Sequence, residues 1–174
     1  MGVSFLRLLT PTTSTLGLIP DGKAGIVETL KQMRAQVRIG KKAMPVRSLA
    51  VFLTQGCGQK DYACEVQQLH AYVRDNIRYI QDITDVETIH SAEKVLEFAS
   101  GDCDDKCILL ASLLESIGHP TKFVAIGFTP GVFSHVYLET KIAESWIPLE
   151  TTENVEAGWQ PEPQAIAARI DFFN

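Results

Sequence analysis

The sequence predicts an α+β fold, with helices in the first two thirds of the chain and an antiparallel sheet in the last third. Two observations indicate this order. Apolar residues recur at helical spacing from about residue 24 to residue 117, and from Thr121 onward they alternate as they do in strands. Helices that precede the strands, instead of alternating with them, favour a sheet packed on helices. At 174 residues, the chain is long enough to bury a substantial core.

Each expected element has its own local signal. Pro45 lies in the first turn of its helix, Ser91 caps another, and Gly118 followed by Pro120 ends the last one. The expected helices are 24–39, 45–54, 61–77, 91–98 and 103–117; the expected strands are 121–128, 133–140, 144–151 and 170–173, with a short extended piece at 78–82. We expect an N-terminal arm and helices (1–76) to pack on a core (77–174) in one compact domain.

Composition and charge exclude several classes of function. The chain is 45% hydrophobic and 21% charged, which is ordinary for a folded protein. Its formal net charge of -5 gives no electrostatic basis for binding nucleic acid or an anionic membrane. No apolar run approaches the roughly 20 residues that span a bilayer, and Pro11 with polar neighbours interrupts a signal-peptide pattern. The expected location is therefore the cytoplasm.

The segment Gly101-Asp102-Cys103-Asp104-Asp105-Lys106 begins the most apolar predicted helix. Asp102 is a good N-cap, and Asp105 occupies the position of a capping-box acid. Leucine and isoleucine cover most of the helix surface after Cys107, so the helix should be central and largely buried.

A cysteine at the start of a helix lies in a position that favours ionisation of its thiol. The helix dipole and free N–H groups favour a thiolate there, and the Cys103 N–H could bind an oxyanion. The carboxylates of Asp102, Asp104 and Asp105 act in the opposite direction by repelling a second negative charge. A nucleophilic Cys103 therefore needs a cation beside it, for which histidine is the usual choice. The alternative is a small buried residue in a core helix.

Candidate partners for Cys103 lie on two successive predicted strands. If these strands form a hairpin whose loop is centred between Ile142 and Ala143, His135 lies directly opposite Glu150. A carboxylate in that position would orient the imidazole and stabilise its protonated form. The same register pairs Glu139 with Trp146 and Tyr137 with Pro148. Singly, a strand histidine and a glutamate are more often packing and surface residues; with Cys103 they form a coherent thiol triad.

The other cysteines and histidines have simpler interpretations. Cys57 and Cys64 could form a disulfide, but a reducing compartment argues against it. A zinc site built from Cys57, Cys64, Cys103 and Cys107 lacks the paired short gaps typical of such sites, so no metal or cofactor is expected. His70, His90 and His119 are interpreted as packed or solvated.

Three segments together resemble the transglutaminase-like superfamily, whose core is papain-like. The first is Gly101 to Lys106 with the apolar helix that follows and then Gly118 to Phe123; the second is Ser134 to Glu139, and the third is Trp146 to Thr152. The resemblance extends from about residue 77 to residue 152. The family usually has aspartate where this chain has Glu150. The Gly-Asp-Cys-Asp-Asp sequence also resembles small members encoded by phages and prophages, and such an origin would associate the protein with a virion.

The resemblance implies acyl transfer on a peptide or side-chain amide, with a protein or peptide as substrate. Cys103 would be the nucleophile, His135 its ion-pair partner and proton donor, and Glu150 the group that orients His135. Tyr79 is a candidate second oxyanion donor, and Phe128, Phe133 and Trp146 are candidates for the walls of the site. Water as acceptor would make the protein a peptidase or amidase, and a lysine amine would make it a cross-linker. The alternatives are a non-catalytic domain of the same fold and the four-cysteine metal module.

Overall fold

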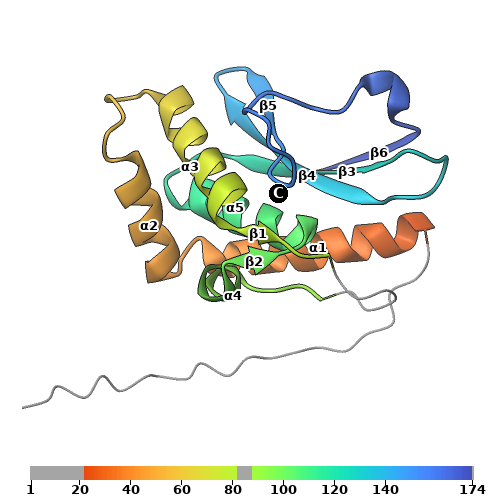
Figure 1. Ribbon diagram of the computed structural model, residues 1–174, viewed down its shortest axis with the longest axis horizontal. Helices are drawn as coiled ribbons and strands as arrows, with labels where there is room; N and C mark the ends of the chain where they lie inside the picture. Colours follow the sequence, from red (N-terminus) through yellow and green to blue (C-terminus); the bar gives the residue numbers. More distant parts are fainter. Residues whose placement is uncertain (1–21, 82–87, 174) are drawn as a thin grey trace, which may run out of the picture.

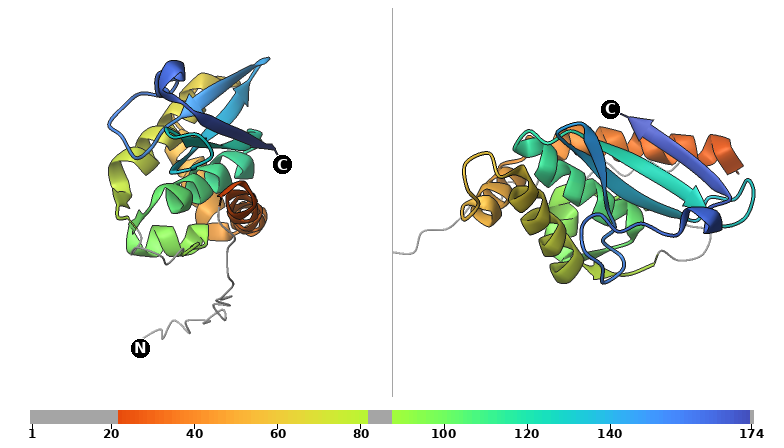
Figure 2. Two further views of the ribbon diagram at one scale, coloured as in Figure 1. Left: turned by 90° about the vertical axis from the view of Figure 1, so that its right-hand side faces the viewer. Right: turned by 90° about the horizontal axis from the view of Figure 1, so that it is seen from above.

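The computed structural model describes residues 22–81 and 88–173, and these form helices packed against one side of a four-stranded sheet (Figures 1 and 2). The helices are α1 (Gly22–Gly40), α2 (Met44–Thr54), α3 (Tyr62–Asn76), α4 (Ala92–Phe98), α5 (Cys103–Ser116) and the 3-10 turn η1 (Pro163–Ala165). The strands are β1 (Arg78–Tyr79), β2 (Ser100–Gly101), β3 (Thr121–Gly127), β4 (His135–Ile142), β5 (Ser145–Leu149) and β6 (Ala168–Phe173). None of the described helices is long and apolar enough to cross a membrane.

Helix α5 lies at the centre of the molecule, as the sequence predicts. It packs against α1, α2, α3 and α4 and against strands β3 and β4 (Figure 1). Every residue from Asp104 to Leu114 is buried. The buried ammonium of Lys106 donates a hydrogen bond to the carbonyl of Ile77 at 2.7 Å, which ties α5 to the chain just after α3. The prediction of a central, buried cysteine helix is confirmed.

The start of α5 differs in one detail from a capping box. The Asp102 side chain accepts a hydrogen bond from the Asp105 N–H at 3.0 Å, so the predicted N-cap is present. The buried Asp105 carboxylate bonds His90, accepting from its backbone N–H and contacting its ring Nδ1, both at 2.8 Å. Gly101 permits this approach, because a Cβ on it would lie 2.5 Å from the Asp105 Cβ. Asp105 therefore ties the start of α5 to the segment before α4.

The four-stranded sheet has the order β5-β4-β3-β6 and is antiparallel throughout. One face, with Phe123, Ala125, Val136 and Leu138, joins the main core over α5. The predicted C-terminal edge strand is present as β6, which pairs with β3. The short strands β1 and β2 pair in parallel and bring Tyr79 beside Gly101, just before the cysteine helix. The mixed helix-and-sheet prediction is confirmed.

The register of the β4–β5 hairpin is not the predicted one. Glu139 pairs with Pro148 and Lys141 pairs with Trp146, which moves each partner by two residues from the expected position. The loop is centred between Ala143 and Glu144, and Ala143 takes a left-handed conformation with a φ of 52°. A displacement of two residues keeps every side chain on its expected face.

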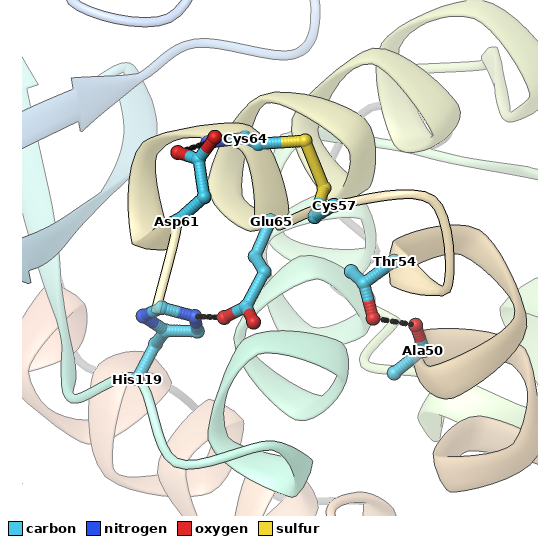
Figure 3. Close-up of a disulfide and its surroundings, with 7 residues drawn as sticks. All are labelled: Ala50, Thr54, Cys57, Asp61, Cys64, Glu65 and His119. Atoms are coloured by element: carbon cyan, nitrogen blue, oxygen red, sulfur yellow. Dashed lines mark hydrogen bonds and ion pairs between the residues drawn. A yellow bond between two sulfur atoms is a disulfide. The ribbon is translucent and has the colours of Figure 1, made fainter. Parts of the chain in front are cut away.

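Cys57 and Cys64 form a disulfide in the connection between α2 and α3, so the expectation that they stay reduced is wrong (Figure 3). The chain turns back at the end of α2 and brings their Cα atoms to 5.7 Å, within the usual range for a disulfide. The bond joins residues at a sequence separation of 7 and closes onto the first turn of α3, where Asp61 caps the Cys64 N–H. The expectation rested on an assumed compartment and not on the residues themselves.

We expect reduction of this disulfide to lower the free energy of unfolding by about 2–3 kcal/mol, because a short closed loop restricts the unfolded chain. Denatured without reductant, the chain should take up two alkyl groups and not four, since Cys103 and Cys107 are the free cysteines. Thermal melts with and without reductant measure the stability change. A Cys57→Ser, Cys64→Ser double variant is the control and should melt alike in both conditions. Four alkylated thiols in unreduced protein would show that the bond is not formed.

Candidate active site

The side chains of His135 and Glu150 are in direct contact. His135 is the first residue of β4, and Glu150 follows the last residue of β5. The His135 Nε2 lies 2.6 Å from the Glu150 Oε2, so the predicted pair is present although the predicted register is not. Since Nε2 is engaged with the carboxylate, Nδ1 is the imidazole nitrogen that remains for proton exchange with a nucleophile.

Glu150 is buried, with 2% of its surface exposed, and its carboxylate has further partners. Its Oε1 accepts hydrogen bonds from the Thr152 N–H at 2.6 Å and from the Thr152 hydroxyl at 2.7 Å. Burial alone would raise the pKa of Glu150, but the hydrogen bonds from His135 and Thr152 outweigh it, and the pKa lies below its ordinary value. Glu150 is therefore an anion at neutral pH and can stabilise an imidazolium.

A cleft of about 500 Å³ opens beside this pair. Its lining includes His135, Glu150 and Tyr79, so three of the four residues expected at the site border one cavity. The remaining lining residues are Phe128, Ser134, Thr152, Glu153, Val155, Trp159 and Pro161. Burial raises the pKa of Tyr79, and the carboxylates of Asp102 and Asp104 raise it further. Its phenol therefore stays protonated at neutral pH and can act as a hydrogen-bond donor.

Cys103 is the first residue of α5 and is partly buried; it is not among the residues that line the cleft. Its thiol donates a hydrogen bond to the Asp104 Oδ1 at 3.6 Å. It also lies against the backbone of Val136, the residue that follows His135 on β4. The structure thus brings the thiol to the strand that carries His135, but among the described side chains its hydrogen-bond partner is Asp104.

The acidic neighbours affect the thiol as the sequence indicates. Burial raises the pKa of the Cys103 thiol well above its ordinary value, and the carboxylates of Asp104 and Asp102 raise it further, while a backbone hydrogen bond at Val136 lowers it. Cys103 is consequently a neutral thiol at neutral pH, so its ionisation requires a base.

Cys107 lies one turn further along α5 and is fully buried. Its thiol donates a hydrogen bond to the Val136 carbonyl at 3.5 Å, and burial raises its pKa well above the ordinary value. Cys107 therefore packs α5 against β4. The four-cysteine metal module does not fit this structure, because the disulfide occupies Cys57 and Cys64. Within residues 22–81 and 88–173, no three His, Cys, Asp or Glu side chains are grouped to hold a metal ion.

Sequence reasoning missed two residues that hold Glu150. Thr152 follows it by two positions, a spacing at which a backbone N–H can bond the preceding acidic side chain, so its role had a local signal. His70, on α3, reaches the Glu150 carbonyl from 80 residues away and had no such signal. Of the aromatic residues considered as walls, Phe128 lines the cleft, whereas Trp146 does not line it and its ring instead contacts the Lys122 ammonium.

Comparison with known proteins supports the fold. The model of a protein family described as the transglutaminase-like superfamily matches residues 47–151, a stretch that includes most of α2 and all of α3. A structure of a proposed protease from Parabacteroides distasonis matches with a TM-score of 0.58 and 14% identity, over 81% of this chain and 32% of that one. A proposed cysteine protease from Cytophaga hutchinsonii matches with a TM-score of 0.51 and 20% identity, over 75% of this chain and 46% of that one. No curated protein matches.

This chain spans less than half the length of either solved structure. At these identities the likeness shows the fold: the helices and antiparallel sheet form the papain-like arrangement of transglutaminase-like proteins.

Removal of the Asp104 charge should make Cys103 react at lower pH. In an Asp104→Asn variant, the rate of Cys103 alkylation by iodoacetamide should rise at a pH about one unit lower than in the unmodified protein. The reason is that the Asp104 carboxylate raises the pKa of the thiol. Mass spectrometry after timed alkylation locates and measures the adduct. Glu28→Gln, an exposed acid on α1, is the control; an identical profile for Asp104→Asn would contradict the assigned effect of Asp104.

Proposed function

Because the chain belongs to the transglutaminase-like superfamily, we propose that it is a cysteine-dependent enzyme that transfers the acyl group of a peptide or side-chain amide. The observation that carries this proposal is the His135–Glu150 pair, which borders a cleft with a separation of 2.6 Å between Nε2 and Oε2. The residue after His135, Val136, lies against Cys103 at the start of α5. A thiol, an imidazole and an anchored carboxylate are the groups that covalent acyl transfer requires.

The first step moves one proton and forms one bond. His135 accepts the thiol proton at Nδ1 as Cys103 Sγ attacks the carbonyl carbon of the substrate amide. This general-base route suits a thiol whose pKa is raised, and it replaces the preformed thiolate–imidazolium pair expected from the sequence. The protonated imidazole is stabilised by the Glu150 anion through Nε2.

The tetrahedral intermediate then collapses. The carbon–nitrogen bond breaks, His135 returns its proton to the leaving amine, and a thioester remains on Cys103. The N–H of Cys103 at the start of α5 and the phenol of Tyr79 serve as the oxyanion donors. Water or a second amine, deprotonated by His135, attacks the thioester and frees Cys103.

The cleft favours a substrate with an apolar side chain near the reacting amide. Phe128 and Trp159 leave 52% and 42% of their surfaces exposed, and with Val155 and Pro161 they give the cleft apolar walls. Exposed aromatic rings beside a cavity are typical of a binding surface. Glu153 borders the same cleft and disfavours acidic residues in the substrate. The substrate is thus proposed to be a protein or peptide.

Substitution of Cys103 should abolish catalysis, because no other group in the proposed mechanism can form the thioester. We expect Cys103→Ala to lower the rate by at least ~10³-fold, with His135→Ala close to it and Glu150→Gln less severe. Dye-quenched casein measures hydrolysis, and casein with dansylcadaverine measures transfer to an amine. These two assays also decide between water and an amine as acceptor.

Cys107→Ala is the matched control for Cys103→Ala, since it removes a thiol from the same helix one turn away. It should stay active and lose some stability, on the order of 1 kcal/mol, because Cys107 packs in the core. Full activity in Cys103→Ala would remove Cys103 as the nucleophile. A folded protein with no Cys103-dependent reaction in either assay would favour the non-catalytic alternative.

A further inference from the structure

We propose that His70 of α3 is a positioning residue for the catalytic acid: it holds the main chain of Glu150, and thereby aims the Glu150 carboxylate at His135. The proposal rests on the proposed function, because it assigns His70 a role in orienting the same Cys103–His135–Glu150 site.

The contact is short and completely enclosed. His70 has no exposed surface, and its Nε2 lies 2.5 Å from the Glu150 carbonyl oxygen. A carbonyl only accepts hydrogen bonds, so Nε2 carries the proton and Nδ1 is unprotonated. Burial lowers the pKa of His70, and the nearby Arg74 charge lowers it further against the opposing effect of the carbonyl bond. His70 is therefore a neutral, fixed donor that keeps its proton during catalysis.

The unused nitrogen of His70 argues against a purely packing role. Nδ1 is buried and has no hydrogen-bond partner among the described residues. A buried polar atom without a partner is unfavourable, and an apolar side chain of similar size would avoid it. The hydrogen bond from Nε2 to Glu150 is what the histidine adds at this position.

Glu150 needs such an anchor because it lies just beyond the sheet. The β4–β5 ladder ends at the Leu138–Leu149 pair, so strand pairing does not hold the Glu150 main chain. Thr152 fixes the Glu150 carboxylate from one side, and His70 fixes its backbone. Together they set both ends of a side chain that must reach His135 at 2.6 Å.

Arg74, four residues after His70 on α3, extends the same arrangement. Its Nη1 donates to the Val155 carbonyl at 2.8 Å and to the Glu156 carboxylate at 3.1 Å. Helix α3 thus bonds the segment after β5 at two points: His70 contacts Glu150, and Arg74 contacts Val155, which lines the cleft. The site consists of α5, β4 and this segment, and α3 fixes the position of the segment.

The test compares His70→Leu, which removes the donor, with His70→Gln, which keeps an N–H donor. With dye-quenched casein, His70→Leu should lower kcat by about 10- to 100-fold with KM within about twofold, because a small displacement of the acid misaligns His135. His70→Gln should recover part of the loss in kcat.

His119→Leu is the matched control. His119 is also a buried histidine, and it pairs with Glu65 at 2.7 Å at the turn before β3, close to the disulfide and away from the cleft (Figure 3). It should lower the melting temperature and leave kcat and KM unchanged. A folded His70→Leu protein with unchanged kcat would overturn the proposal.

The NMR signal of the His135 Nε2 proton, compared between the unmodified protein and His70→Leu, gives a second readout that needs no substrate. In the unmodified protein this proton lies in the 2.6 Å contact with the Glu150 Oε2, and in His70→Leu its signal should shift upfield or disappear because the carboxylate is displaced. An unchanged signal would overturn the role of His70. If casein is not processed and the signal still changes, the proposed function fails and the positioning role of His70 stands.

Discussion

The burial of α5 on every side is the constraint on which the rest of this structure depends. A helix with buried residues from Asp104 to Leu114 must be covered by other elements all round, and α1 to α4 with the sheet provide that cover. Its N-terminus must also find partners for buried carboxylates and N–H groups, which explains the Asp102 cap and the Asp105–His90 contacts. The position of Cys103 follows, because it is the first residue of the helix that the core fixes most firmly.

The carboxylate of Glu150 is a second buried charge, and it organises the other half of the site. A buried anion is tolerated only when hydrogen bonds and a countercharge replace water. Thr152 and His135 supply them, and the resulting pKa below the ordinary value means that the hydrogen bonds exceed the cost of burial. Because the pKa of Glu150 is lower in the folded protein than in the unfolded chain, Glu150 makes stability depend on pH. Its contribution is fully present above the unfolded pKa and is lost as the pH falls through the folded pKa.

The sequence contains enough to predict α5 and its cap, because Asp102 and the apolar run after Cys107 are local signals. It also predicts the His135–Glu150 contact, but from the wrong register. Lys141 to Glu144 offer no glycine or asparagine to fix the turn, and Ala143 adopts the left-handed conformation that such residues usually take. Because the register is displaced by two residues, the side chains stay on their expected faces of the sheet. His135 therefore still reaches Glu150, although the two residues are not directly opposite each other. His70 could not be predicted, since its bond to Glu150 depends on how α3 packs.

The chemistry at the start of α5 is a balance between folding and reactivity. The carboxylate that caps the helix, Asp102, and its neighbour Asp104 raise the pKa of the thiol that the proposed mechanism needs as an anion. In the proposed mechanism the thiol is ionised by proton transfer to His135 on the sheet, and not by the N-terminus of the helix. A base of that kind is only as effective as its orientation, and here the orienting acid is a glutamate, with one more methylene than the aspartate usual in the family. The extra freedom of that side chain is restricted by its anchors, Thr152 at the carboxylate and His70 at the main chain. In the proposed mechanism, α3 therefore helps to position the acid without contacting the substrate.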